Sequence, residues 1–459
     1  MHEITGDKDT VQSILKDTIA QLEQSAATGK KGGSKALSVS GKKKAGAPDA
    51  AGLWQDALDR MDKKGVSAAG LKKGKVRGER AVETMYAPRD QKIALFQSAM
   101  DEYLDETVGP ATPAGGAKGT KKTSKAASAK TSKKPAATAD VFYKGGKSPK
   151  AGTKTKGVDI FAQFGNLDPR WIEVVSEKTK LYFKGKHAFT THKSANDFRF
   201  QMDNETTVAI VGDWGGGNAA AQAVSQQIQK LNPNHVIHLG DVYYAGTAKE
   251  VKERFLKFWP KPKAPGQSFA LNSNHEMYSG GYGYFDLTLP EFKQPASYFS
   301  LANDNWRFVG LDTGYDEHDL KDPQAAWLKS QLTGGQKNIL LSHHQLFSAY
   351  ETTDASKLRA KVQGLLDKVY GWIWGHEHLC VVYEKKDGIN GICLGNGCFP
   401  YKLPKGQPAI PVKWLDTEQG SDPDYPGGHT FALLRIKGPR IDIDFRDHNG
   451  NLSHSETWE

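Results

Sequence analysis

Apolar side chains are spaced differently in the two halves of this chain, and the difference predicts helices first and strands later. Near the amino terminus they recur every three or four positions, in Val11, Ile14, Leu15, Ile19 and Leu22. That interval places them on one face of a helix. The same spacing predicts further helices over residues 53–61 and 93–104. Such stripes are typical of a small helical bundle, or of helices that bind a partner.

In the second half, short apolar runs alternate with helical patterns. Residues 207–211 and 236–239 predict strands, and residues 219–231 and 249–259 predict the helices that follow them. Further strands are predicted over residues 268–271, 306–311, 339–342, 371–374, 391–394, 431–436 and 441–445. Strands bounded by Gly and Asp, with helices between them, indicate an α/β domain with a largely parallel sheet that is covered on its faces.

Between the two halves the composition shifts to Lys, Ala, Gly, Ser, Thr and Pro. Residues 118–156 contain twelve lysines and a single acid, Asp140. A stretch with so little apolar surface cannot offset the entropy of an ordered chain, so we expect a disordered linker. The alternative is weak, salt-sensitive attraction to nucleic acid or another polyanion. Sequence-specific recognition is not expected, because only Phe142 and Tyr143 offer rings that stack on bases.

Order is predicted to resume at residue 158. The pair Asp168-Pro169 marks a helix start, and residues 170–183 follow with apolar spacing. A chain of 459 residues exceeds the roughly 250–300 at which one core stops growing. We therefore expect four segments, which are helices with flexible spacers over residues 1–106, the linker over 107–157, an ordered extension packed on the α/β domain over 158–205, and the α/β domain over 206–459.

Charge and cysteine content indicate in which compartment of the cell the protein is expected. The formal net charge is +10, yet residues 1–150 hold 28 Lys and Arg against 17 Asp and Glu, and the rest of the chain holds 34 against 35. The excess of basic residues therefore lies in residues 1–150 and not in the rest of the chain. Three cysteines do not form a disulfide framework, and no secretory signal or apolar run of about 20 residues is visible. We expect a cytoplasmic protein that does not cross a membrane.

Five clusters of metal-ligand residues follow predicted strands in the second half. They are GDWGG at residues 212–216, GDVYY at 240–244, NSNHE at 272–276, SHH at 342–344 and GHEH at 375–378. Sites of parallel sheets lie beyond the carboxyl ends of their strands, so these clusters are expected to meet. Any one of them has a plain structural explanation, such as a Gly-Asp turn or a packed histidine. Five in succession predict a site for two metal ions.

The types of donor suit the hydrolysis of phosphate esters. Asp213 and Asp241 supply carboxylates, which can bridge two cations, and Asn274 supplies a neutral amide oxygen. The imidazole nitrogens are typical donors to zinc, iron and manganese, and they come from His343, His376 and His378.

An acid for the leaving alkoxide is also present. His275 adjoins the ligand Asn274 and is the candidate general acid, with Glu276 the candidate to orient it. The aromatic and glycine-rich residues 279–285 are expected either to rim the pocket or to form a plain surface loop.

These clusters resemble the motifs of the calcineurin-like metallophosphoesterase superfamily, which are D-x-[HG], G-D-x-x, G-N-H-[DE], G-H and G-H-x-H. The resemblance covers residues 207–378 strongly and continues loosely to about residue 448. It implies an α/β/β/α sandwich with the dimetal site at the carboxyl ends of the strands. Two departures are visible, because Ser273 replaces the usual Gly and residues 342–345 read SHHQ instead of G-H-x-P.

Within the superfamily, the chain is most similar to the purple acid phosphatases of the tartrate-resistant type. Most members have a His two residues after the first Asp, where this chain has Gly215. The purple enzymes supply a Tyr three residues after the second Asp, and Tyr244 occupies that position. Tyr243 is the rival phenol, and His344 is the rival of His343.

This resemblance implies two ligand sets. The first metal, expected to be ferric iron, would be held by Asp213, Asp241, Tyr244 and His378. The second, expected to be iron(II), zinc or manganese, would be held by Asp241, Asn274, His343 and His376.

We therefore expect a dinuclear metal-dependent phosphohydrolase, in which a metal-bound hydroxide attacks phosphorus and His275 protonates the departing oxygen. The resemblance favours phosphomonoesters as substrates. One alternative is a phosphodiesterase or nuclease whose basic tail recruits a polyanion. Another is a binding or scaffold protein in which the polyanion-binding amino-terminal region is the functional part.

Overall fold

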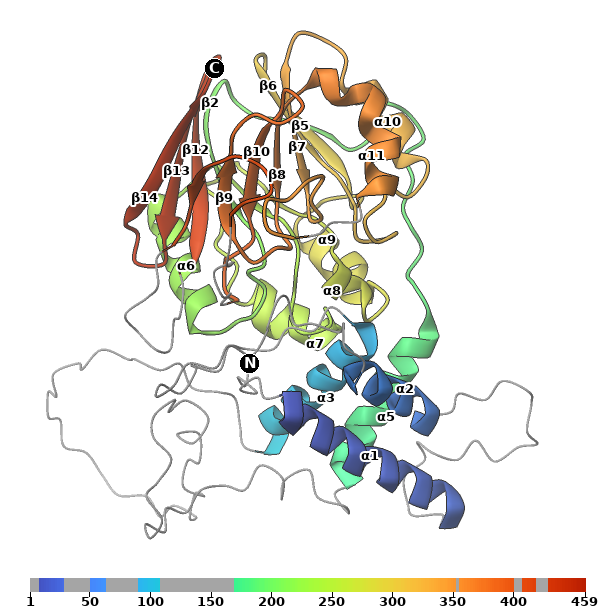
Figure 1. Cartoon of the computed structure of the whole chain (residues 1–459). Coiled ribbons are helices and arrows are strands. Elements are labelled where there is room, and N and C mark those ends of the chain that lie inside the picture. Colours follow the sequence, from blue (N-terminus) through green and yellow to red (C-terminus); the bar gives the residue numbers. More distant parts are fainter. Residues whose placement is uncertain are drawn as a thin grey trace, which may run out of the picture.

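A sandwich of two β-sheets and a separate group of four helices make up the computed structural model of this chain (Figure 1). The structure describes residues 8–28, 50–62, 90–107, 169–351, 355–399, 407–417 and 428–459. The predicted disordered linker lies outside these residues from position 108 onward, as does the lysine-rich stretch 118–156. Within the described ranges, none of the helices has the length and apolar content that a membrane crossing requires.

The four helices of the amino-terminal part, here called the helical unit, pack around one hydrophobic cluster. Trp54 and Trp171 contact Phe96 at ring-centroid distances of 5.4 and 5.5 Å. Their buried indole N–H groups donate to Thr179 and Thr18, so neither indole donor is left without an acceptor. The helices are α1 (Lys8–Thr28), α2 (Ala50–Asp62), α3 (Gln91–Thr107) and α5 (Pro169–Lys184). The apolar stripes of the sequence thus form a bundle.

The predicted extension over residues 158–205 does not pack as one piece on the catalytic domain. Its helix, α5, buries Trp171, Val174 and Val175 in the hydrophobic cluster of the helical unit. Its last part forms β1 (Arg199–Gln201), which pairs with a strand of the sandwich. The apolar spacing of α5 predicted the helix, but it did not specify which apolar surface the helix would cover.

One sheet of the sandwich has six strands in the order β14-β13-β12-β2-β3-β4. The strands β2, β3 and β4 are parallel, whereas β12, β13 and β14 join them as an antiparallel set. Their bounds are β2 (Glu205–Val211), β3 (His235–His238), β4 (Ser268–Ala270), β12 (Thr430–Lys437), β13 (Arg440–Asp447) and β14 (Leu452–Trp458).

The other sheet has eight strands in the order β1-β5-β6-β7-β8-β10-β9-β11. Its central strands β6, β7, β8 and β10 are parallel, and antiparallel pairs occur toward both edges. The remaining bounds are β5 (Phe299–Ala302), β6 (Trp306–Gly310), β7 (Lys337–Ser342), β8 (Val369–Trp374), β9 (Cys380–Tyr383), β10 (Asn390–Leu394) and β11 (Val412–Leu415).

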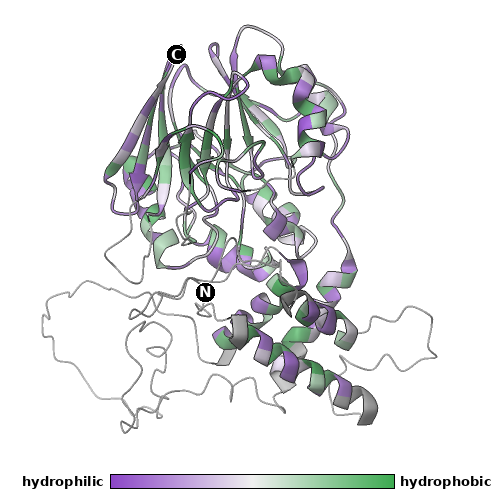
Figure 2. Cartoon of the chain, viewed as in Figure 1, coloured by the Kyte–Doolittle hydropathy of each residue, from purple (hydrophilic) through white to green (hydrophobic). Residues whose placement is uncertain are grey.

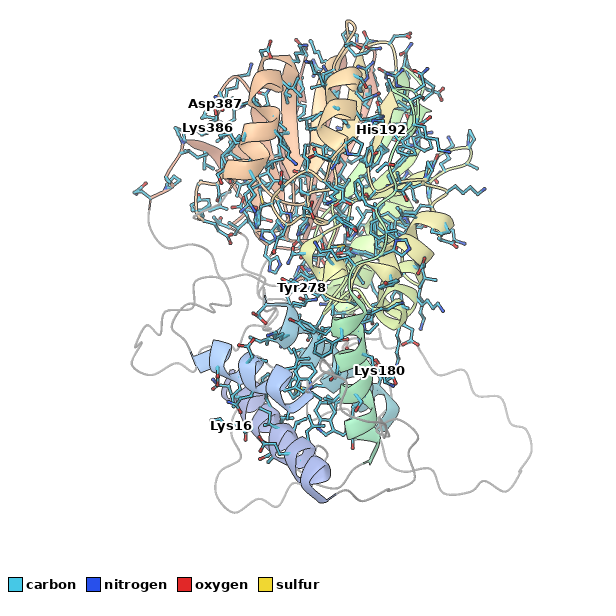
Figure 3. All side chains as sticks on the ribbon, turned by 90° about the vertical axis from the view of Figure 1, so that its right-hand side faces the viewer. Lys16, Lys180, His192, Tyr278, Lys386 and Asp387 are labelled. Atoms are coloured by element: carbon cyan, nitrogen blue, oxygen red, sulfur yellow. The ribbon has the colours of Figure 1, made fainter. Side chains whose placement is uncertain are left out.

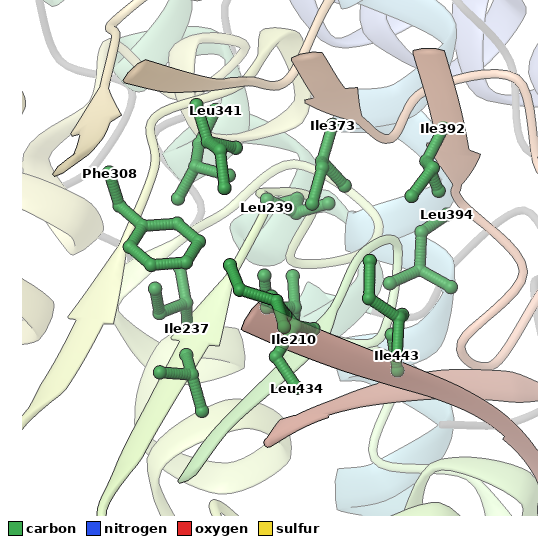
Figure 4. Close-up of a cluster of buried hydrophobic side chains, with 14 of the residues drawn as sticks. Ile210, Ile237, Leu239, Phe308, Leu341, Ile373, Ile392, Leu394, Leu434 and Ile443 are labelled. Carbon is green, nitrogen blue, oxygen red and sulfur yellow. The ribbon is translucent and has the colours of Figure 1, made fainter. Parts of the chain in front are cut away.

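The expectation of one largely parallel sheet is therefore wrong, because the chain builds two mixed sheets. Their inner faces share a hydrophobic core that includes Ile210 and Ile237 from one sheet and Leu341 and Ile373 from the other (Figure 4). Both outer faces are also covered, so strands such as β12 are buried on both sides and lack the alternation that marks an antiparallel strand. Figure 2 shows how strongly apolar the central strands are.

Helices cover the two outer faces, which confirms the α/β/β/α layering. The six-stranded sheet packs against α6 (Ala219–Leu231) and η2 (Val251–Leu256), and the eight-stranded sheet packs against α10 (Gln324–Gln331) and α11 (Ser356–Val362). The helix predicted over residues 249–259 begins with α7 (Ala248–Glu250), where Thr247 and Glu250 form a capping box, and continues as η2. The short elements that remain are α8 (Asn274–Met277), η3 (Tyr284–Thr288), α9 (Leu289–Glu291) and η4 (Gln363–Lys368).

Candidate metal centre

The central strands of both sheets end at one place, and the five ligand clusters follow them there. Asp213 and Asp241 lie in the turns after β2 and β3, and Asn274 begins α8 after β4. His343 directly follows β7, and His376 follows β8. Since these strands belong to different sheets, the site is built where the two layers of the sandwich meet.

Four of these residues adopt a backbone conformation that side chains other than glycine rarely take. Asp213, Asp241, His376 and His378 have φ values of 54°, 78°, 70° and 54°. Residues in this left-handed region carry a steric penalty and concentrate at functional sites. The turns that carry the predicted ligands are therefore selected for where they place these side chains and not for local stability.

One half of the site gathers around a phenol. The hydroxyl oxygen of Tyr243 lies 3.3 Å from Asp213 Oδ1 and 3.0 Å from Asp241 Oδ2. It also lies 3.0 Å from Nε2 of His378, and that nitrogen is 3.4 Å from Asp213 Oδ1. Two carboxylates, one phenol and one imidazole thus meet within hydrogen-bonding distance.

The phenol that lies among the carboxylates belongs to Tyr243, the rival of Tyr244, and Tyr244 as a metal ligand stays a prediction. The backbone N–H of Tyr243 donates to the Gly215 carbonyl, in a short bridge between the first two ligand turns. Tyr244 has its backbone N–H bonded to Glu250 Oε1, and the rings of both tyrosines belong to the hydrophobic cluster outside the six-stranded sheet. Spacing from Asp241 alone did not separate the two tyrosines.

The other half gathers around His343. Its Nε2 lies 2.9 Å from Asn274 Oδ1, 3.2 Å from Asp241 Oδ1 and 3.1 Å from His376 Nδ1. The structure therefore brings His343, rather than His344, to Asp241 and Asn274. The two oxygens of Asp241 face the two halves of the site, since Oδ2 is the one that contacts Tyr243.

The donor atoms fit a cation. The Nδ1 of His343 donates to the Leu239 carbonyl over 2.9 Å, so a neutral imidazole presents an unprotonated Nε2 to the site. The Nδ2 of Asn274 donates to the Tyr278 hydroxyl over 2.8 Å, which turns its carbonyl oxygen inward. An imidazole nitrogen, an amide oxygen and a carboxylate oxygen converge as acceptors, and such a set suits zinc, iron or manganese.

His275, the predicted general acid, directs its Nε2 toward the site, but the carboxylate of Glu276 contacts other residues. The Nδ1 of His275 donates to the Tyr244 carbonyl over 2.6 Å, so Nε2 faces the site, 3.8 Å from Asp241 Oδ2. The carboxylate of Glu276 accepts instead from the Ser273 hydroxyl and from the Asp241 backbone N–H. Ser273 caps α8, and Glu276 turns back toward that cap, which takes it away from the imidazole.

Burial and neighbouring charges shift the pKa values of the acidic residues at the site. Burial raises the pKa of Asp241, but the charge of a protonated His275 and the Ser273 hydrogen bond act against burial, and the pKa is lowered. Burial and the charge of Asp241 together raise the pKa of Glu276 to about 8. Glu276 is therefore a protonated partner of an ionised Asp241 near neutral pH.

The structure adds a histidine that sequence reasoning missed. His318 lies in the loop after β6, with its ring 4.1 Å from that of His344 and 5.5 Å from that of His376. Ligand atoms of these three histidines lie within 4.8 Å of one another. No local signal marks His318, because it stands in a polar loop and not directly after a strand. His344 bonds to Thr313 Oγ1 over 3.1 Å and forms the link between His318 and the site.

A two-sheet sandwich whose strand ends bring together carboxylates, an amide and imidazoles defines a metal-dependent hydrolase domain. Residues 206–380 match the family model of calcineurin-like phosphoesterases, so this part of the chain carries that family-model domain. The family uses a dinuclear metal site, and the resemblance found in the sequence is thereby confirmed.

Two relatives support the same assignment. Tartrate-resistant acid phosphatase type 5 of Oryctolagus cuniculus is 23% identical over 284 residues, which cover 52% of this chain and 86% of the relative. The protein of the same name from Homo sapiens is 22% identical over 285 residues, with the same coverage. Among solved structures, GAP50, the anchor in the inner membrane complex of Plasmodium, aligns with 56% of this chain and 89% of its own at 14% identity and a TM-score of 0.44.

Proposed function

We propose that this protein is a dinuclear metal-dependent phosphohydrolase that acts on phosphomonoesters. The observation that carries the proposal is the position of Asp241, whose two oxygens face two separate groups of donors. One carboxylate that contacts both groups is the arrangement that holds two cations close together. Asp213, Asp241, Tyr243 and His378 would bind the first metal. Asp241, Asn274, His343 and His376 would bind the second.

The donors differ enough to favour two different ions. A phenol, two carboxylates and one imidazole form a hard, anionic set that suits ferric iron. The second set has an amide oxygen and two imidazoles beside the shared carboxylate, and it suits iron(II), zinc or manganese. When bound, the ions supply charge that polarises phosphate oxygens and lowers the pKa of water.

The residues of the chain supply orientation and proton transfer. Because Nδ1 of His275 is held by the Tyr244 carbonyl, its Nε2 is the atom that delivers a proton to the departing oxygen. The phenol of Tyr243 lies beside this ring, with the two centroids 4.7 Å apart. Tyr243 and Asp241 thus lie beside the part of the His275 ring that carries Nε2.

The preference for monoesters rests on the similarity to acid phosphatases, and substrate comparison tests it. The full chain should be assayed with a nitrophenyl monoester and a bis-nitrophenyl diester after loading with iron and zinc. We expect faster turnover of the monoester, and a loss of about 100-fold or more in kcat for His275→Asn with metal content unchanged. A diester rate above the monoester rate would contradict the substrate class, and an unaltered His275→Asn rate would contradict the role of the acid.

A further inference from the structure

The helical unit touches the parts of the catalytic domain that stand directly behind the metal centre. Two catalytic-domain residues, Ala245 and Tyr278, are members of the hydrophobic cluster that the four helices enclose. Figure 3 shows Tyr278 at the junction, between the sandwich and the helices. We infer that the helical unit positions the proposed metal ligands Asn274 and Tyr243, through Tyr278 and Arg254 respectively, and so completes a site that the phosphoesterase domain does not build alone.

The first connection runs through Tyr278. Its hydroxyl accepts from Nδ2 of Asn274 over 2.8 Å, and in this arrangement the amide oxygen faces the site. Its backbone carbonyl accepts from Nε2 of Gln91, at the start of α3, over 2.9 Å. Its ring is buried against the helical unit. The residue that orients the ligand is therefore held by the helices on its ring and on its backbone.

The second connection runs through Arg254, which lies in η2. Its guanidinium donates to the Tyr243 carbonyl over 3.2 Å, and so fixes the backbone of the residue whose phenol lies among the carboxylates. The same guanidinium forms a salt bridge with Asp101 of α3, and Asp105 lies 3.6 Å away. Asp101 is fully buried and Arg254 nearly so. A buried cation of this kind needs its carboxylate partner to remain charged and in place.

Glu250 makes this second connection sensitive to Asp101. Its carboxylate accepts from the backbone N–H groups of Tyr244, Ala245 and Thr247, at 2.7, 3.2 and 2.9 Å. It also lies 3.5 Å from Arg254. If Asp101 no longer neutralised Arg254, Glu250 would become the nearest anion, and its attraction to the guanidinium would compete with the bonds that hold the turn at residues 243–247.

The positioning role belongs to residues outside the domain that matches the phosphoesterase family. Gln91, Asp101 and Asp105 lie outside residues 206–380, the part that matches the phosphoesterase family. They touch neither the carboxylates nor the imidazoles of the site, so they act as positioning residues. The inference rests on the proposed metal site for its effect on activity, but the effect on the backbone of residues 243–247 is independent of any metal.

The test compares three variants of the full chain. Tyr278→Phe removes only the hydroxyl that orients Asn274, and Asp101→Asn removes the charge that neutralises Arg254. Thr18→Val is the matched control, because it breaks the bond to Trp171 inside the helical unit and contacts neither Tyr278 nor Arg254. Metal affinity would be measured by calorimetric titration with Zn²⁺, and backbone mobility by hydrogen–deuterium exchange of the metal-free protein.

We expect both junction variants to bind Zn²⁺ about 10- to 100-fold more weakly, the range typical of residues that orient metal ligands. Asp101→Asn should also exchange faster at residues 243–247, and Asp101→Glu should restore most of the protection. Thr18→Val should lower the unfolding temperature with Zn²⁺ affinity within twofold of the original. Equal affinity and equal exchange in all three variants would overturn the inference.

The outcomes separate this inference from the proposed function. If the unmodified protein binds no metal, the proposed function fails, while faster exchange in metal-free Asp101→Asn still supports the positioning role. If Asp101→Asn does not fold, Tyr278→Phe decides the matter, because it keeps the buried ring and removes one oxygen atom. Unchanged Zn²⁺ affinity in Tyr278→Phe would then count against the inference.

Discussion

The backbone N–H of His376 donates to Oδ2 of Asp213 over 2.8 Å, and this bond joins the two sheets at their carboxyl ends. Asp213 follows β2 of the six-stranded sheet, whereas His376 follows β8 of the eight-stranded sheet. The carboxylate is held by one oxygen and presents the other, Oδ1, to Tyr243 and His378. The position of the proposed first metal thus depends on how closely these two turns approach.

Gly375 permits this approach, and a methyl group there should disrupt it. A Cβ at Gly375 would lie 2.5 Å from Asp213 Oδ2, far inside van der Waals contact. We expect Gly375→Ala to displace the carboxylate, to reduce metal affinity by about 10-fold or more and to destabilise the fold by about 1–3 kcal/mol. Calorimetric metal titration and urea unfolding measure the two effects.

Gly364 offers the matched control, since a Cβ there meets nothing within 4 Å. Gly364→Ala should leave metal affinity and stability close to those of the original protein. A Gly375→Ala variant that behaves like this control would show that the Asp213 carboxylate has room to move without loss of the site.

The two adjacent tyrosines give opposite predictions. Tyr243 contacts both carboxylates through its hydroxyl, so Tyr243→Phe should abolish the visible phenolate-to-iron absorption and lower iron affinity. Tyr244→Phe should retain that absorption, because the hydroxyl that lies beside both carboxylates belongs to Tyr243. Absorption spectra of both iron-loaded variants decide between them. Loss of colour in Tyr244→Phe alone would restore the assignment made from sequence spacing.

The contrast between these tyrosines shows what sequence patterns specified. Asp213, Asp241, Asn274, His343 and His376 were predictable because each follows an apolar run, and strands of this fold end at one edge. Tyr243 was not, since its orientation depends on partners from elsewhere. The Gly215 carbonyl and Arg254 fix its backbone, and neither is a neighbour in sequence.

Partners distant in sequence also explain the errors in the fold. β12 is buried along both faces, so its antiparallel pairing with β2 left no alternating pattern to detect. The stripe of α5 predicted a helix correctly, but Trp171 packs on Phe96 of another helix rather than on the sandwich. Local pattern defines elements, whereas long-range packing defines their partners.

Removal of metal should weaken the fold. Asp213 and Asp241 are buried and contact the same phenol oxygen, so a cation between them relieves repulsion between two carboxylates. At a free Zn²⁺ concentration 100 times its dissociation constant, the free energy of unfolding should rise by about 2.7 kcal/mol over the chelated protein. Asp241→Asn should lose most of this gain. Identical urea midpoints with chelator and with Zn²⁺ would argue against a metal-binding site.

His429 should make stability fall in mild acid. Burial and the charge of His448 lower its pKa from 6.5 to about 4. Between these values the unfolded chain binds a proton that the folded chain does not, so the stability present above pH 6.5 is lost progressively as the pH falls. We expect a loss of up to about 3 kcal/mol from this residue by pH 4.

Urea unfolding of the original protein and of His429→Asn, from pH 7 to pH 4, measures this contribution. The variant should show the shallower decline, because it has no imidazole to protonate at that position. His192→Asn, which removes a histidine bonded to the Tyr298 hydroxyl, serves as the control and should keep the original slope. Parallel profiles for all three proteins would mean that protonation of His429 is not coupled to unfolding.

His318 should affect substrate binding more than metal binding. It is partly exposed, and its ring lies against His344 and His376 rather than against Asp241. Imidazole N–H groups at this side of the centre are placed to donate to the phosphate of a bound ester.

We expect His318→Asn to raise KM for a nitrophenyl monoester by about 10-fold, the loss of roughly one charge-assisted hydrogen bond. Its kcat and Zn²⁺ affinity should change by less than about threefold, because His318 lies beside the proposed ligand His376 but belongs to neither proposed ligand set. His454→Asn is the control, since that ring stacks on Trp414 in a remote strand. A fall in Zn²⁺ affinity with KM unchanged would instead make His318 a support of the metal ligand His376.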